Sequence, residues 1–126
     1  MLRATHEWAE RIESALNTIG LSAAKFEALR HLATSTEPLT LGDLADQASC
    51  VRSNITQLVD RLEADALVER VDDSYDRRVI RAQLTSVGRE RYAAGAKLVD
   101  AVSAEFSAAI TAPDRAALNR LLARLQ

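Results

Sequence analysis

The sequence predicts a mostly α-helical fold with one small β-hairpin. Apolar residues recur at intervals of three and four along most of the 126-residue chain, which is typical of amphipathic helices. Between residues 67 and 84 this period gives way to two short strand-like runs on either side of a polar turn. The single cysteine excludes an internal disulfide framework, so the fold must depend on an apolar core. Hydrophobic residues make up 48% of the chain, which is ample for one domain of this length.

Two helices are expected before the central region. The first runs from about Thr5 to Ile19, and Gly20 stands where a helix is expected to end. Ser22 can cap the second helix, which is followed by a polar break that ends at Pro38. The expected apolar faces are Trp8, Ile12, Ala15, Leu16 and Ile19 in the first helix and Phe26, Leu29, Leu32 and Ala33 in the second.

A short third helix and a longer fourth helix follow. Thr40 and Asp43 form a capping-box-like start for the third helix. The fourth helix covers Arg52 to Asp65 and carries one continuous apolar stripe. The expected inward residues are Leu41, Leu44 and Ala45 in the third helix and Ile55, Leu58, Val59 and Leu62 in the fourth.

The opposite face of the fourth helix carries short side chains that can hydrogen-bond. Such side chains reach base edges and phosphates while the helix backbone comes close to a duplex. An ordinary amphipathic surface helix explains this run equally well when the run is taken alone. Ser53, Gln57, Asp60 and Arg61 point outward, and Asn54 and Thr56 lie on the flanks.

The region after this helix has the pattern of a β-hairpin with basic residues beside its turn. The first strand is Leu67–Val71, and the second ends at Leu84 after a polar turn at 72–75. Arg77 and Arg78 lie next to the turn. The narrow minor groove of A·T-rich DNA has an enhanced negative potential and accepts such an arginine. The hairpin is therefore predicted to act as a wing.

Two helices are expected after the hairpin. A long one runs from Ser86 to about Ile110, and Thr111–Asp114 separates it from a last helix. Their apolar residues are Val99, Val102, Phe106, Ala109 and Ile110, then Leu118, Leu121, Leu122 and Leu125.

Taken together, these segments resemble the MarR family of bacterial winged-helix transcription regulators. The resemblance is carried by residue types and by the gaps between them, and with the weaker helical pattern it spans nearly all of the chain. The matching segments are Leu44–Ala45, Arg52–Glu63, Leu67–Arg70, Asp76–Arg78 and Leu84–Thr85.

The resemblance implies a winged helix-turn-helix flanked by N- and C-terminal dimerisation helices. Residues 22–85 would be the DNA-binding part and residues 1–21 and 86–126 the dimerisation helices, all within one domain, 1–126. We expect a cytoplasmic homodimeric repressor with two recognition helices about 34 Å apart on a pseudo-palindromic duplex. The resemblance also implies that a small-molecule effector relieves DNA binding.

The candidate site residues follow from this assignment. One of the two wing arginines is expected to enter the minor groove, while the other is tied to the backbone or to a carboxylate. Asp76 would orient that pair, and Asp60 is a candidate partner across the helix–wing junction. Trp8 and Tyr92 either line an effector pocket or belong to the core. Ser53, Asn54, Thr56 and Gln57 are expected on bases or phosphates, Arg52 and Arg61 on phosphates, and Arg77 and Arg78 at the wing.

Two positions depart from the family pattern, and one invites a different function. Val51 stands where a serine commonly caps the recognition helix, and a missing cap costs about 1 kcal/mol. Ala66 stands where glycine is usual, which costs about 1 kcal/mol if that position is left-handed. Cys50 is expected to be buried and inert, although a redox sensor acting through Cys50 is an alternative.

Other classes of function find little support in the sequence. The net charge of −2 disfavours a non-specific, charge-driven nucleic-acid binder and leaves a protein-interaction module as an alternative. His6 and His31 have no ligand spacing for a metal. No catalytic constellation or cofactor motif is present, so we expect neither an enzyme nor a cofactor. No run is apolar enough to span a membrane, and no secretion leader is expected.

Overall fold

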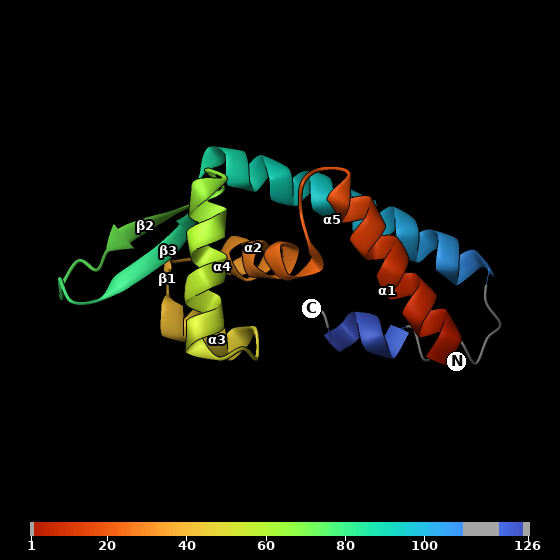
Figure 1. Cartoon of the computed structure of the whole chain (residues 1–126), viewed down its shortest axis with the longest axis horizontal. Coiled ribbons are helices and arrows are strands. Elements are labelled where there is room, and N and C mark those ends of the chain that lie inside the picture. The colour runs from red at the N-terminus through yellow and green to blue at the C-terminus, as the bar shows by residue number, and fades with distance from the viewer. Residues whose placement is uncertain (1, 110–118, 125–126) are drawn as a thin grey trace. The chain divides into compact units, whose positions relative to one another are not determined.

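The computed structural model describes residues 2–109 and 119–124. Its contacts divide the chain into two compact units, Met1–Leu21 with Gly95–Gln126, and Ser22–Ala94. The boundary between Ala94 and Gly95 falls inside the long helix α5 (Ser86–Ala109). From the sequence, all of 86–126 was expected to belong to the flanking helices. Figure 1 shows the helices and strands, coloured from the N-terminus to the C-terminus.

The first unit contains helix α1 (Leu2–Asn17), the later part of α5 and the helical segment 119–124. The stripe predicted on α1 is confirmed for Trp8, Ile12 and Leu16, which are buried, whereas Ala15 is half-buried and Ile19 lies beyond the end of the helix. Gly20 adopts a φ of 76° after the helix, and the Leu21 amide donates to the Leu16 carbonyl at 3.0 Å. This is the left-handed helix ending that glycine permits.

Polar and apolar contacts join α1 to α5 within this unit. Arg11 pairs with Glu105, and its guanidinium lies 5.9 Å from the centre of the Phe106 ring. Val102 is buried. Leu121 and Leu122 of the predicted last helix are half-buried, whereas the predicted break Thr111–Asp114 and the residues Ile110, Leu118 and Leu125 lie outside the described residues.

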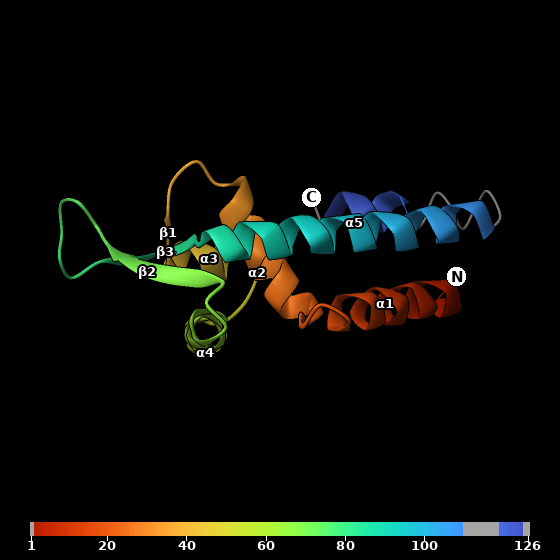
Figure 2. The same cartoon turned by 90° about the horizontal axis from the view of Figure 1, so that it is seen from above.

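The second unit is a small helical core with a three-stranded antiparallel sheet. Its strand order is β1-β3-β2, and the β2–β3 hairpin extends away from α3 and α4 (Figures 1 and 2). The predicted fold class, a mostly helical winged helix-turn-helix with a small β-hairpin wing, is confirmed. The elements are α2 (Ala23–Thr34), β1 (Leu39–Thr40), α3 (Leu41–Gln47), α4 (Arg52–Ala64), β2 (Val68–Asp72), β3 (Ile80–Leu84) and the start of α5.

Strand β1 was not predicted. It is two residues long, and Leu39 pairs with Ala82 while Thr40 pairs with Arg81. A strand of this length has no period that a sequence pattern could reveal. The predicted helix caps are confirmed. The Ser22 hydroxyl accepts from the Lys25 amide, and the Thr40 hydroxyl accepts from the Asp43 amide.

The apolar core of this unit gathers one face from every helix and from the hairpin. The stripe of α4 is its centre, and Leu58 at the edge of that stripe is only half-buried. The residues with at most 1% exposure are Ala28, Leu29, Leu44, Ile55, Val59, Leu62, Leu67, Val68 and Ala82. No helix in the described part of the chain is both long and apolar enough to cross a bilayer.

A tight junction connects the end of α4 to the hairpin and to the start of α5. Ala66 has a φ of 62°, so the left-handed position expected there is present. The Thr85 hydroxyl donates to the Ala66 carbonyl at 2.6 Å and accepts from the Gly88 amide at 3.0 Å. A Cβ atom on Gly88 would lie 1.9 Å from the Leu67 carbonyl oxygen. The first turn of α5 therefore packs directly against the backbone between α4 and β2.

We expect the substitution Gly88→Ala to destabilise the fold by about 3 kcal/mol, because the added methyl must displace backbone and not a side chain. Urea unfolding followed by circular dichroism measures the effect. Gly42→Ala is the matched control, since its Cβ would lie 3.3 Å from the mobile Nη1 atom of Arg52. Equal stability of the two variants would contradict the close approach at Leu67.

The substitution Ala66→Gly should raise the free energy of unfolding by about 1 kcal/mol, because glycine has no Cβ penalty at positive φ. Ala64→Gly is the control, since Ala64 is an exposed residue with helical backbone at the last position of α4. There the same change should lower stability by about 1 kcal/mol. The same unfolding measurement applies, and a destabilising effect at both positions would show that position 66 carries no strain.

Candidate nucleic-acid interface

The outward face of α4 presents an open row of polar side chains. Ser53, Asn54 and Gln57 are exposed, and within the described part of the chain they make no side-chain hydrogen bond. Their donors and acceptors are therefore available to a ligand. Arg61 is also exposed on this helix.

Thr56 and Arg52 are more constrained than their neighbours. Thr56 is half-buried, and its hydroxyl donates to the Arg52 carbonyl at 3.0 Å. This leaves an acceptor lone pair and a methyl group for any outside contact. The Arg52 side chain lies against the start of α3, where the lack of a side chain on Gly42 leaves room for its Nη1 atom. Arg52 is thus directed toward α3 as well as toward solvent.

The start of α4 lacks a side-chain cap. Val51 occupies the cap position with φ −73° and ψ 150°, makes no capping hydrogen bond, and is 62% exposed. Neither Ser49 nor Ser53 replaces the missing cap. The helix therefore begins without about 1 kcal/mol of stabilisation that serine would supply there.

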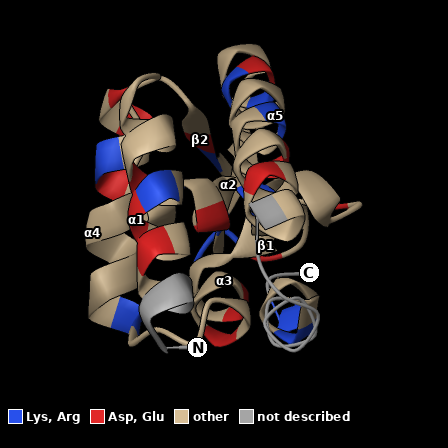
Figure 3. Cartoon of the chain, turned by 90° about the vertical axis from the view of Figure 1, so that its right-hand side faces the viewer, with Lys and Arg blue, Asp and Glu red and all other residues tan. Residues whose placement is uncertain are grey.

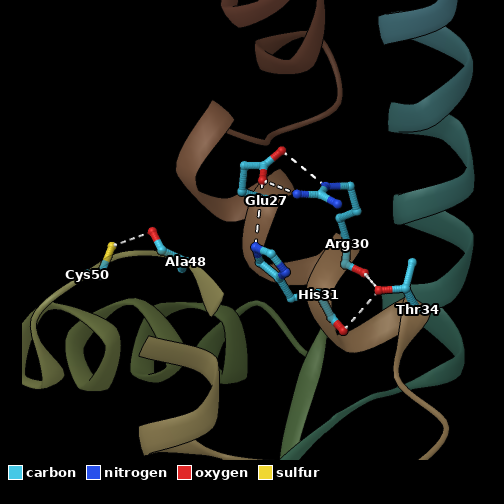
Figure 4. A network of polar contacts seen from close by, with 6 residues as sticks. All are labelled: Glu27, Arg30, His31, Thr34, Ala48 and Cys50. Carbon is cyan, nitrogen blue, oxygen red and sulfur yellow. Dashed lines mark hydrogen bonds and ion pairs between the residues drawn. The ribbon is translucent and has the colours of Figure 1, made fainter. Parts of the chain in front are cut away.

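The prediction that Cys50 is buried was wrong. Cys50 is exposed, and its thiol donates to the Ala48 carbonyl at 3.5 Å (Figure 4). The cause lies in the turn that ends α3, where Ser49 has a φ of 54°. The Cys50 amide donates back to the Ala45 carbonyl at 2.9 Å, so the chain is held close to α3 while the side chain remains in solvent.

An arginine on the hairpin joins the wing to α4. Arg70 of β2 donates to Asp60 at 2.5 Å and to Glu63 at 2.6 Å. The hydrogen bond that Arg70 donates to Asp60 is the main cause of the raised pKa of Arg70. Asp60 thus has a partner across the helix–wing junction, and that partner is Arg70 and neither Arg77 nor Arg78.

The two arginines beside the wing turn have different surroundings. Asp76 accepts from the Arg78 amide at 3.0 Å, from its Nε at 3.1 Å and from its Nη2 at 3.2 Å. The side-chain hydrogen bond from Arg78 lowers the pKa of Asp76. Arg78 is nevertheless 90% exposed. Arg77 is exposed and has no ion pair among the described residues.

Sequence reasoning missed two residues that hold the wing turn. Asp73 accepts from the Tyr75 and Asp76 amides, each at 3.0 Å, and from Arg81 Nε at 2.7 Å. The bond from Arg81 is the main cause of the lowered pKa of Asp73. An aspartate two and three residues before the amides it accepts from is the usual arrangement of an Asx turn, so the spacing in 73–76 was a usable signal.

Helix α2 carries a separate polar network (Figure 4). Glu27 accepts from Arg30 at 3.2 and 2.7 Å, and His31 lies 3.8 Å from the same carboxylate. Burial lowers the pKa of His31, so the ring is mostly neutral at pH 7. His6 pairs with Glu10 at 2.9 Å. Among the described residues, no three His, Cys, Asp or Glu side chains are grouped so that they could hold a metal ion.

The two aromatic residues considered for an effector pocket lie in different units. Trp8 is buried in the first unit, and its Nε1 has no hydrogen-bond partner among the described residues. Tyr92 stacks on Phe26 in the second unit, with ring centres 5.4 Å apart. Each residue packs within its own unit, and a role in effector binding stays a prediction.

Basic and acidic side chains are interspersed. Figure 3 shows Lys and Arg alternating with Asp and Glu along the helices instead of forming one basic stripe. Any binding of nucleic acid must therefore come from the arrangement of particular groups at α4 and the wing.

Comparisons with known proteins agree with this arrangement. The sequence model of the MarR family matches residues 19–79. The uncharacterized HTH-type transcriptional regulator YsmB of Bacillus subtilis (strain 168) is 36% identical over 73 residues, 58% of this chain and 49% of YsmB. The HTH-type transcriptional regulator FarR of Neisseria gonorrhoeae is 35% identical over 77 residues, 61% of this chain and 52% of FarR. The chain spans about half the length of these curated relatives.

A solved structure extends the likeness to nearly the whole chain. The transcriptional repressor CouR, bound to a 23-mer DNA duplex, is 26% identical, with a TM-score of 0.84. That match covers 96% of this chain and 85% of the CouR chain. This chain is thus similar in sequence to the MarR family over residues 19–79, and similar in fold to a solved DNA-bound transcriptional repressor over nearly its whole length.

Proposed function

We propose that this protein is a transcriptional regulator that binds double-stranded DNA through α4 and the wing. The observation that carries the proposal is an outward face of α4 with unbonded polar side chains, joined to a hairpin that ends in two exposed arginines. This is the arrangement by which a helix reads the major groove while a hairpin reaches the neighbouring minor groove. The solved complex of CouR with DNA supports the same use of the fold.

Different residues of α4 are proposed to contact the bases and the phosphates. Ser53, Asn54 and Gln57 provide hydrogen bonds to base edges or phosphates, and Thr56 contributes its remaining lone pair and methyl group. Arg52 and Arg61 provide charge for phosphates at the two ends of the exposed face.

At the wing, the sequence led us to expect that an arginine tied to a carboxylate stays out of the minor groove; we propose instead that Arg78, although tied to Asp76, enters it and that Arg77 contacts a phosphate. Asp76 accepts two hydrogen bonds from the Arg78 side chain, so less side-chain entropy is lost when DNA is bound. The 90% exposure of Arg78 leaves its remaining N–H groups open. Asp60 acts through Arg70, which ties the hairpin to α4. Asp60 and Asp76 are thus positioning residues in this proposal.

The proposed assembly is a homodimeric repressor on a pseudo-palindromic operator. An isologous dimer through the first unit would place the two copies of α4 one helical turn of DNA apart. Trp8 Nε1 and Ser103 Oγ are buried polar atoms of that unit without a partner among the described residues. Because both atoms are already buried in the single chain, a second copy or a small-molecule effector would reach them only if neighbouring side chains move.

The test is fluorescence anisotropy with duplexes selected from a random-sequence pool, at several salt concentrations. We expect tight binding for the parent, and for Arg77→Ala with Arg78→Ala an affinity at least about tenfold lower and a salt slope shallower by about 1 to 2. The slope changes because fewer phosphate charges are neutralised.

Arg120→Ala with Arg124→Ala is the control, because it removes the same charge from the described helical segment of the first unit. This pair should leave the salt slope almost unchanged. If selection yields no duplex that the parent prefers over random DNA, the protein-interaction alternative replaces the DNA-binding proposal.

The exposure of Cys50 favours a second candidate function, redox control of DNA binding. The thiol precedes α4 by two residues, so its oxidation would place a polar group at the start of the recognition helix. If this function exists, peroxide lowers DNA affinity in the parent but not in Cys50→Ser, as measured by the same anisotropy assay. A response of equal size in both proteins would eliminate Cys50 as the sensor.

A further inference from the structure

One carboxylate closes the wing turn from inside. The Asp73 side chain is 13% exposed, and its Oδ2 atom accepts from the Tyr75 and Asp76 amides, both at 3.0 Å. The backbone closes around the same residue, because the Asp73 amide donates to the Val79 carbonyl at 3.1 Å and the Val79 amide donates to the Asp76 carbonyl at 3.0 Å. The stretch that bears Arg77 and Arg78 is thus a loop closed at its base on Asp73.

The other oxygen of Asp73 connects this loop to the body of its unit. Arg81 of β3 donates from Nε to Asp73 Oδ1 at 2.7 Å and from Nη1 to the Pro38 carbonyl at 3.0 Å. Pro38 directly precedes β1, whose Thr40 pairs with Arg81 in the sheet. A continuous path of polar contacts therefore runs from the wing turn to the segment between α2 and α3. We call Asp73, Arg81 and the Pro38 carbonyl the wing clamp.

Apolar packing does little to hold the turn. Tyr75, its one aromatic residue, is 97% exposed. Beside the clamp lies an open hollow of about 390 Å³, whose lining includes Asp73, Tyr75 and Arg81. A segment with few buried apolar contacts keeps one shape only if polar contacts hold it. The clamp supplies those contacts.

We infer that Asp73 is a positioning residue for DNA binding, and that the wing clamp holds the turn in the shape that presents Arg77 and Arg78 to the duplex. The inference rests on the proposed DNA-binding function and extends it to residues without DNA contacts of their own. A turn held in its bound shape before DNA arrives loses less conformational entropy on binding. The clamp thereby acts on affinity through the arginines.

The neighbouring residue Asp72 offers a matched comparison. It carries the same charge at the end of β2, is exposed, and has no ion pair among the described residues. Removing either carboxylate removes one negative charge near the phosphates. Electrostatics alone therefore predicts that both alanine variants bind DNA as tightly as the parent or more tightly. The clamp predicts opposite outcomes for the two residues.

The experiment measures anisotropy of a duplex selected by the parent from a random-sequence pool, across a range of salt concentrations. Asp73→Ala should bind about tenfold more weakly, with a salt slope shallower by about 1, because a wing arginine no longer reaches its phosphate. Asp72→Ala should bind as tightly as the parent or tighter, with the parent's slope. Equal or tighter binding by Asp73→Ala would overturn the inference.

Amide hydrogen exchange without DNA tests the clamp itself. The Tyr75 and Asp76 amides should lose protection in Asp73→Ala and keep it in Asp72→Ala. Asp73→Asn should keep most of that protection, because one amide oxygen can accept both bonds, and should recover part of the DNA affinity. Unchanged protection in Asp73→Ala would refute the clamp even if affinity fell.

These readouts separate the inference from the function on which it rests. Thermal unfolding by circular dichroism identifies any variant that loses affinity because the whole unit unfolds, and Asp73→Asn then decides the outcome. If the parent binds a selected duplex and the two alanine variants behave alike, the clamp is wrong and DNA binding stands. If the parent selects no duplex, both are overturned.

Discussion

Burial of one face of α4 is the constraint on which the rest of the structure depends. Ile55, Val59 and Leu62 have no exposed surface, and burying each contributes about 1.5–3 kcal/mol. A helix that must keep this stripe in the core cannot rotate about its axis. Its opposite face is then forced into solvent, which makes the polar row at Ser53 and Gln57 a stable surface. The buried stripe of α4 that stabilises the fold thus also fixes the orientation of the polar face that is proposed to contact DNA.

The backbone at the end of α4 determines the direction in which the wing extends. The chain leaves α4 through Ala66 at positive φ, and the closeness of Gly88 to Leu67 leaves this junction little freedom. Arg70 then ties β2 back to Asp60 and Glu63. Each successive contact lies farther from the apolar core and is more polar. At the turn the described hydrogen bonds converge on one carboxylate, which is why we infer that Asp73 determines the shape of the turn.

The helices and the hairpin could be predicted because each carries a period or a cap that depends on local sequence alone. Ser22 and Thr40 predicted the starts of α2 and α3, and the alternation of apolar and polar residues around Ala82 predicted β3. Strand β1 and the exposure of Cys50 could not be predicted in this way. The first exists only because β3 offers a partner distant in sequence, and the second depends on the positive φ of Ser49. The polar row on α4 and the wing arginines could be picked out as candidates, whereas the partner of Asp60 lay on another element.

The low net charge has a structural explanation at the proposed interface. Three carboxylates of α4 and the wing are engaged in ion pairs, Asp60 with Arg70, Asp73 with Arg81 and Asp76 with Arg78. Each of these negative charges is offset locally by its arginine. The net charge of the whole chain therefore misstates the electric field that a duplex would meet at this surface. A protein of this kind gains little from non-specific attraction to phosphates. In the proposed function, discrimination between DNA sites would come from geometry, and the carboxylates that make the net charge negative take part in the ion pairs that fix this geometry.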